Sequence, residues 1–230
     1  MVEILTGIHR IDGVNPCSYV IVEDDGSLTL VDTGMSKDGR KVLDYIQAKI
    51  SKKPSDLKTI LLTHRHTPYV IGVSAIKKPT GAKVAIHEED ADYLSRKKTM
   101  RAPKGAVGIL FRISEPFLTF TPVEPDQRLK ESDRVGSLTV LHVPGHTPGS
   151  ISLYDQRRKT IFVADIIRYE KGRLQGPPEE FTFDINEARN SIQKISSVEF
   201  NTMLGGQGDT FMSNDAPQKV KDLAASMHQE

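Results

Sequence analysis

The stretch ILLTHRHTPYVIG, residues 60–72, places two histidines directly after an apolar run. A short apolar run of this kind is typical of a buried strand. If the chain stays extended past Thr63, the side chains of His64 and His66 point to the same side, because strand side chains alternate. Two imidazoles on one side of a strand end can bind one metal ion. The stretch therefore predicts a buried strand that delivers a pair of metal ligands.

Strands and helices alternate along the whole chain, with no linker-like change of composition. This alternation predicts a single α/β domain over residues 1–230, with layered sheets and outer helices. Residues 99–135 are less regular and hold four prolines, which favours a lid or binding loop. The expected strands are at 19–23, 27–31, 57–62, 83–86, 138–141, 151–154, 160–163 and 201–204, and the expected helices are at 36–50, 70–77, 87–94, 184–195 and 216–227.

Composition excludes several classes of protein. The chain has 230 residues, with 31 Lys and Arg against 30 Asp and Glu, a formal charge of +1. This balance requires no nucleic acid or membrane partner, so a small-molecule substrate is expected. Cys17 is the single cysteine, which excludes an internal disulfide. The N-terminus does not resemble a signal peptide and no apolar run reaches the ~20 residues of a membrane span, so we expect a cytoplasmic protein.

Two further polar residues follow apolar strands in the same way. His146 lies in HVPGHTPGS, a Gly- and Pro-rich loop, and Asp165 follows the run TIFVA. Ligand sites of α/β sheets gather at the carboxyl ends of strands. Three imidazoles and a carboxylate suit zinc or iron. Taken singly, the two histidines at 64 and 66 are as consistent with a surface or capping pair, and Asp165 with a turn residue, so the metal site depends on the set.

Several motifs of the sequence, taken in order, resemble those of a known family. THRHTPYVIG resembles the THxHxDHxGG motif of the metallo-β-lactamase superfamily. VDTG, PGHTPGS, the strand-ending AD of TIFVAD, and GGQGD also fall in the family's order. The resemblance covers nearly the whole chain. It implies a four-layer αββα sandwich, closest to the glyoxalase II-like and lactonase-like hydrolases. It also implies that Asp32 of VDTG supports the metal loop by hydrogen bonds.

The resemblance also implies the roles of individual metal ligands. His64, His66 and His146 would form the first metal site, with Asp165 at the ion or between two ions. The family's second metal uses an aspartate and two histidines of its own.

At those three positions this chain has Pro68, Tyr69 and Gln207. Proline offers no side-chain donor, a tyrosine phenol has a pKa near 10 and binds only as a phenolate, and glutamine offers one weak neutral oxygen. The resemblance therefore implies that the ligands of the second metal have been replaced and that one ion is bound.

Three functions remain open from the sequence. The first is a hydrolase of an ester, thioester, lactone or lactam that uses one zinc ion and its hydroxide, with Asp165 orienting the water. Tyr69 would donate a hydrogen bond to the oxyanion, or else simply pack. The second is a mononuclear non-haem iron oxygenase whose iron is held by one histidine of the pair, His146 and Asp165. The third is a largely inactive metal-binding scaffold, diverged or engineered.

Overall fold

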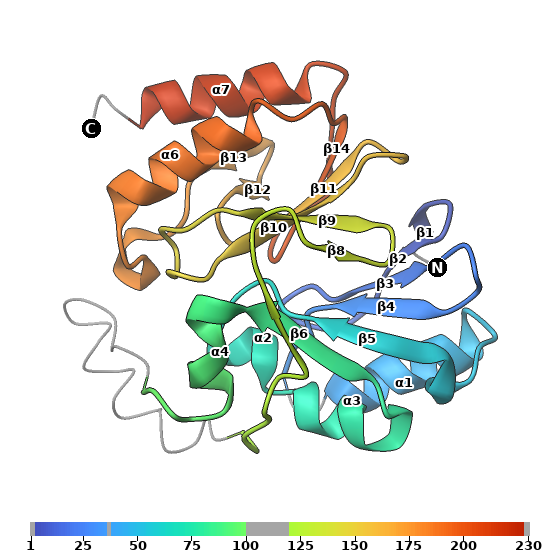
Figure 1. Ribbon diagram of the computed structural model, residues 1–230. Helices are drawn as coiled ribbons and strands as arrows, with labels where there is room; N and C mark the ends of the chain where they lie inside the picture. Colours follow the sequence, from blue (N-terminus) through green and yellow to red (C-terminus); the bar gives the residue numbers. More distant parts are fainter. Residues whose placement is uncertain (1–2, 36–37, 100–119, 228–230) are drawn as a thin grey trace. The chain divides into compact units, whose positions relative to one another are not determined.

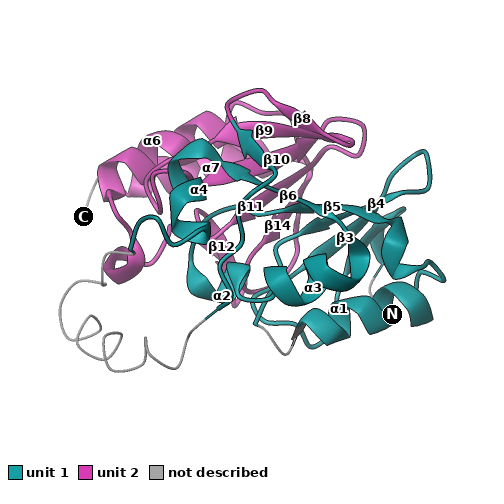
Figure 2. Cartoon of the chain, turned by 60° about the horizontal axis from the view of Figure 1, so that its bottom comes forward, with its two compact units in different colours: residues 1–99, 117–129 teal, residues 100–116, 130–230 magenta. Residues whose placement is uncertain are grey.

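The computed structural model describes residues 3–35, 38–99 and 120–227. The chain divides into two compact units, coloured separately in Figure 2. Unit 1 consists of residues 1–99 and 117–129, and unit 2 of residues 100–116 and 130–230. Each unit has its own sheet and its own helices, so each is described by itself.

Unit 1 is built on a mixed seven-stranded sheet, with α1 and α3 along one face (Figure 1). The strands run in chain order: β1 (Glu3–Leu5), β2 (Ile8–Arg10), β3 (Tyr19–Val22), β4 (Leu28–Val31), β5 (Leu57–Leu61), β6 (Lys83–His87) and β7 (Gln127–Leu129). Pairs up to β4 are antiparallel and pairs from β4 onward are parallel. The helices are α1 (Asp38–Ala48), the 3-10 turn η1 (Pro54–Asp56), α2 (Thr67–Val70), α3 (Val73–Thr80) and α4 (Glu88–Leu94).

The strands expected at 19–23 and 27–31 and the helix expected at 36–50 are present as β3, β4 and α1. The turn between β3 and β4 closes with Glu23 N–H donating to the Ser27 carbonyl at 2.9 Å, and Gly26 there has φ +79°. Val42 and Ile46 of α1 are fully buried against the sheet, as their spacing predicts. The expected end of helix 70–77 before Pro79 is wrong. The helix α3 includes Pro79 in its last turn and ends at Thr80, followed by Gly81 as its C-cap with φ +70°.

Unit 2 is built on a mixed six-stranded sheet with α6 and α7 packed along one face (Figure 1). The sheet order is β15, β14, β11, β10, β9, β8, and the β11–β14 pair is its parallel one. The elements are β8 (Arg134–Val135), β9 (Leu138–His142), β10 (Ile151–Asp155), β11 (Thr160–Ala164), β14 (Thr202–Gly205), β15 (Phe211–Met212), the 3-10 turn η3 (Glu179–Phe181), α6 (Ile185–Ile195) and α7 (Ala216–Ser226). Asp184 caps α6, accepting from Asn186 N–H and Glu187 N–H.

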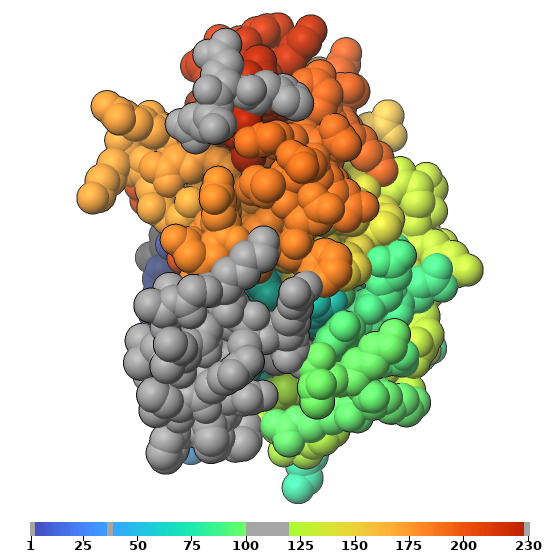
Figure 3. All heavy atoms as spheres, turned by 90° about the vertical axis from the view of Figure 1, so that its left-hand side faces the viewer, coloured from blue at the N-terminus to red at the C-terminus, as the bar shows by residue number. Residues whose placement is uncertain are grey.

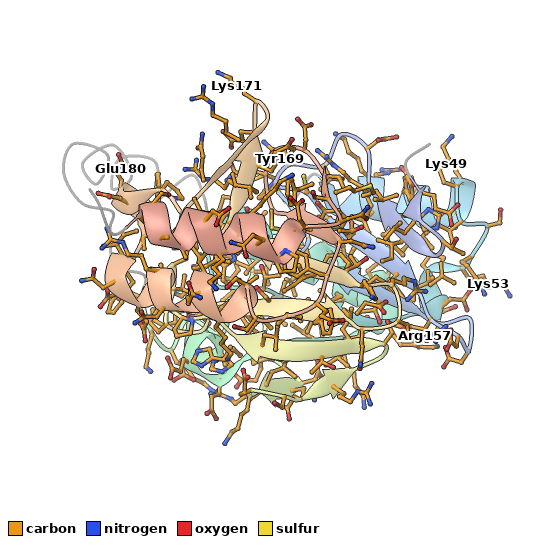
Figure 4. The ribbon with its side chains drawn as sticks, turned by 90° about the horizontal axis from the view of Figure 1, so that it is seen from above. Lys49, Lys53, Arg157, Tyr169, Lys171 and Glu180 are labelled. Atoms are coloured by element: carbon orange, nitrogen blue, oxygen red, sulfur yellow. The ribbon has the colours of Figure 1, made fainter. Side chains whose placement is uncertain are left out.

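A separate hairpin, β12 (Arg168–Glu170) and β13 (Arg173–Gln175), extends from unit 2 and was not expected from the sequence. Figure 4 shows Lys171 at its tip, pointing away from the rest of the unit, with Tyr169 nearer its base. The light-orange atoms of this hairpin project from the surface in Figure 3. Its base is fixed because Asp209 N–H donates to the Tyr169 carbonyl at 3.0 Å.

Two expectations concern domain organisation and the irregular segment. The single domain over 1–230 stays a prediction. Of the lid-like segment 99–135, residues 100–119 lie outside the described residues, and part of the remainder is more regular than expected, since it contains β7 and β8. None of the helices in the described ranges has the length and apolar character that crossing a membrane requires.

Candidate metal centre

The two candidate ligands of unit 1, His64 and His66, lie between the end of β5 and the start of α2. His64 is 1% exposed and His66 is partly buried. Their ring centroids are 4.9 Å apart, edge to face, so the two side chains do share a side, as the alternation predicts. Burial, together with the positive charge of Arg65, lowers the pKa of His66 to about 3. His66 is therefore neutral near pH 7, which is the form that binds a metal.

A hydrogen-bonded chain decides which nitrogen of His64 carries its proton. The Thr63 hydroxyl donates to the Asp32 Oδ2 atom at 2.8 Å and lies 3.1 Å from His64 Nδ1. A hydroxyl has one proton to donate, and here it goes to the carboxylate. The hydroxyl must therefore accept from His64 Nδ1–H, which leaves the lone pair on Nε2. Metal-binding histidines in proteins are oriented by a partner on the other ring nitrogen in this way.

Asp32 holds this loop through its backbone as well as its side chain. Its Oδ1 accepts from Thr63 N–H at 2.9 Å, and its own N–H donates to the Leu61 carbonyl at 2.9 Å. The residue has φ +57°, a left-handed conformation that is uncommon for a residue other than glycine. The supporting role that the resemblance assigns to Asp32 agrees with these contacts.

In unit 2, His146 lies in the tight loop between β9 and β10 and is 2% exposed. Its Nδ1 is 3.3 Å from the Thr182 hydroxyl, which donates to the Pro178 carbonyl at 2.7 Å. Because the Thr182 hydroxyl donates its proton to the Pro178 carbonyl, it accepts from His146 Nδ1–H, as Thr63 does from His64. The Nε2 lone pair of His146 remains. Both buried histidines are thus held in the same tautomer by a threonine.

The loop that carries His146 is fixed against α6 by close backbone contact. Gly145 has φ +126°, and a Cβ there would lie 2.2 Å from the Ala188 backbone nitrogen. Only glycine fits such a position. Phe183 N–H also donates to the His146 carbonyl at 3.2 Å. The glycine that precedes the histidine in the sequence is therefore required by packing.

Asp165 lies directly after β11, where the sequence places it, and is 5% exposed. Its Oδ2 atom is 3.8 Å from His146 Nε2. A carboxylate oxygen and a nitrogen lone pair repel each other unless a cation or a proton lies between them, so this pair suits a shared cation. The preceding residue, Ala164, has φ +44°, so the backbone is strained where it presents Asp165.

Pro68, Tyr69 and Gln207, which the resemblance places at the positions of further ligands, have three different surroundings. Pro68 lies in the first turn of α2, where proline is well tolerated. Tyr69 is 2% exposed and belongs to the unit 1 core, with its ring centroid 4.3 Å from that of His64. The Gln207 side-chain amide donates toward both oxygens of Asp165 at 3.5 Å. For Tyr69, this burial agrees with the packing alternative.

Taken together, His64, His66 and His146 are a group that could hold a metal ion among the described residues. The donor set fits such an ion, since each member offers an imidazole nitrogen of the kind that zinc and iron take. The supporting threonines were not found by sequence reasoning. Thr63 adjoins a predicted ligand, but Thr182 lies 36 residues from His146 and no local pattern indicates it.

Comparison with known proteins finds relatives that match most of this chain. The curated "Probable metallo-hydrolase YflN" of Bacillus subtilis is 24% identical, over 96% of this chain and 91% of its own. The hydroxyacylglutathione hydrolase of Bdellovibrio bacteriovorus is 29% identical, over 81% of this chain and 61% of its own. A solved Cronobacter sakazakii metallo-β-lactamase, described by its HARLDQ motif, has a TM-score of 0.73 at 17% identity, covering 99% of this chain and 95% of its own.

These matches show the fold, an α/β arrangement with two mixed sheets flanked by helices. The model of the metallo-beta-lactamase superfamily matches residues 12–206. That range includes all four candidate ligands, His64, His66, His146 and Asp165. The chain therefore belongs to the metallo-β-lactamase superfamily.

Proposed function

We propose that this protein is a zinc-dependent hydrolase of an ester, thioester, lactone or lactam. In this proposal one ion is held by His64, His66 and His146. The observation that carries it is the tautomer of the two buried histidines, because both present an Nε2 lone pair and both do so through a threonine. Relatives named as metallo-hydrolases and as hydroxyacylglutathione hydrolases support hydrolysis, with a thioester as the first substrate to test.

The chain's own residues have distinct tasks in this proposal. A zinc ion bound here would lower the pKa of a water molecule toward about 7 and polarise a carbonyl group. Asp165, beside His146 Nε2, orients the attacking water by accepting its hydrogen bond. The lowered pKa of His66 keeps that imidazole neutral near pH 7, and the burial of His64 and His146 strengthens the polar interactions that they make. A small-molecule substrate is proposed with this function.

The proposal of a single ion is supported by Gln207. Its amide N–H group faces Asp165, and an N–H donor cannot coordinate a cation. Pro68 and Tyr69 occupy structural positions in α2 and the unit 1 core. We infer that the hydrogen bond from Gln207 satisfies the carboxylate in place of a second ion.

The test is a panel of thioesters, esters, lactones and β-lactams, assayed with protein that has been stripped by a chelator and reloaded with zinc or with ferrous iron. The proposal expects turnover of at least one class that is lost on stripping and restored by zinc. Activity restored by iron alone, with consumption of oxygen, would instead support the oxygenase, for which the Asp165–His146 contact supplies a carboxylate ligand. Metal binding with no turnover of any substrate would favour the scaffold.

A further inference from the structure

Between the two histidines lies an arginine that the proposed chemistry does not use. Arg65 is 5% exposed, and its guanidinium Nη1 is 2.9 Å from Asp90 Oδ1, whose side chain is fully buried. The other carboxylate oxygen, Oδ2, accepts from the backbone N–H of Arg65 at 3.0 Å. Asp90 thus binds the main chain and the side chain of the same residue.

The alternation of side chains gives this contact its direction. His64 and His66 share one side of the extended segment, so Arg65 between them points to the other side. There the guanidinium carbon lies 3.9 Å above the ring of Tyr93. Asp90 and Tyr93 are three residues apart on α4, and so lie on one face of that helix. The helix α4 therefore binds Arg65 on the side of the segment opposite to His64 and His66.

We propose that Asp90 is a positioning residue for the metal, which holds the peptide between His64 and His66 so that both imidazoles face the ion. Tyr93 assists by fixing the guanidinium from its other side. The inference rests on the proposed metal site, and it concerns residues that no motif singled out. A shift of the Arg65 peptide would move both imidazoles together, because they are its two chain neighbours.

The competing explanation is that the pair only attaches α4 to the sheet. Unit 2 supplies a matched control for it. Asp155 is also fully buried, and it binds Arg158 in the same two ways, accepting from the backbone N–H at 3.0 Å and from the guanidinium Nη1 at 2.5 Å. Neither member of that pair neighbours a candidate ligand in the sequence. The Asp90–Arg65 pair therefore holds the segment between two candidate ligands, whereas the Asp155–Arg158 pair does not.

The experiment compares Asp90→Asn with Asp155→Asn by measuring the zinc dissociation constant with a competing chromophoric chelator and the melting temperature of the metal-free protein. The asparagine turns an N–H group toward one of the two arginine donors, so both variants should lose melting temperature to a similar extent. Zinc binding should weaken about 10–100-fold in Asp90→Asn, the usual effect of removing an outer support, and less than about threefold in Asp155→Asn.

If Asp90→Asn does not fold, Tyr93→Leu replaces it, and zinc binding should then weaken by about threefold or more. Equal zinc binding in the wild type and the folded Asp90 or Tyr93 variant would overturn the inference alone. An equal loss in the Asp155 control would also overturn it, because the effect would then follow stability. A wild type that binds no zinc would remove the proposed function and this inference with it.

Discussion

On the single-ion proposal, the positions that the resemblance assigns to a first metal site differ from those that it assigns to a second. His64 and His146 are kept, and each is oriented by a threonine that lies outside the ligand set. Pro68 and Tyr69 have become parts of a helix turn and of a core. On this proposal, metal binding depends on the residues that orient the ligands, here Thr63 and Thr182, as well as on the ligands themselves.

A second contrast lies within the kept set. The Thr63 hydroxyl, beside His64, donates a hydrogen bond to the carboxylate of Asp32 at 2.8 Å. The Thr182 hydroxyl, beside His146, donates instead to the backbone carbonyl of Pro178 at 2.7 Å. Hydrogen bonds to a charged acceptor are about twice as strong as those between neutral groups. We therefore expect His64 to be held more firmly than His146.

The largest effect is expected from removing a ligand. His146→Ala leaves two imidazoles, so zinc binding should weaken by about 1,000-fold or more and hydrolysis should stop. His9→Gln serves as the control, because His9 lies in β2 and contacts Tyr45 rather than a candidate ligand. Zinc affinity is measured by chelator competition. Retention of zinc by His146→Ala at wild-type affinity would remove His146 from the site.

The next effect comes from the threonines, and it tests the contrast between the two supports. Thr63→Val and Thr182→Val each remove the hydroxyl that holds Nδ1–H, and zinc binding should weaken about 10–100-fold. The loss of zinc affinity should be greater for Thr63→Val, because the Thr63 hydroxyl donates to the charged carboxylate of Asp32. Thr→Ser at each position keeps the hydroxyl and should restore most of the affinity. An equal or reversed order would show that the charge of Asp32 does not reach the histidine.

A smaller effect is expected on the pH dependence of stability. The pKa of His66 is about 3 in the folded chain and near 6.5 when unfolded, so the unfolded state binds the proton more readily. Stability of the metal-free protein should therefore be complete above pH 6.5 and fall as the pH is lowered from 6.5 toward 3. Urea unfolding at pH 7.5 and pH 5 measures the fall. His66→Gln should show a shallower fall, and an unchanged slope would contradict the burial of this imidazole.

The smallest effect is expected at Tyr69. Because its side chain is packed in the unit 1 core, Tyr69→Phe should leave kcat and zinc affinity within about threefold of the wild type. The assay uses the best substrate from the hydrolysis panel. A fall in kcat of about 100-fold with unchanged zinc affinity would show that the phenol acts on the reaction, as an oxyanion donor would.

Sequence periodicity predicted most strands and helices of both sheets, because their buried residues recur at the spacing of the element. It did not predict β1, β2, β7, β8, β15, or the hairpin of β12 and β13, which are short and gain their order from neighbouring strands. The HxH geometry followed from strand alternation. The supports did not, because Thr182 and Asp90 lie far along the chain from the histidines they serve, and only the folded backbone brings each to its partner.

The central claim is that one metal ion binds where the supported histidines are, with no second ion beside it. The direct measurement is the number of metal equivalents per chain in protein saturated with zinc and then desalted, for the wild type and for the triple variant Pro68→Asp, Tyr69→His, Gln207→His. The account predicts one equivalent in the wild type and two in the triple variant. Two equivalents in the wild type would contradict it.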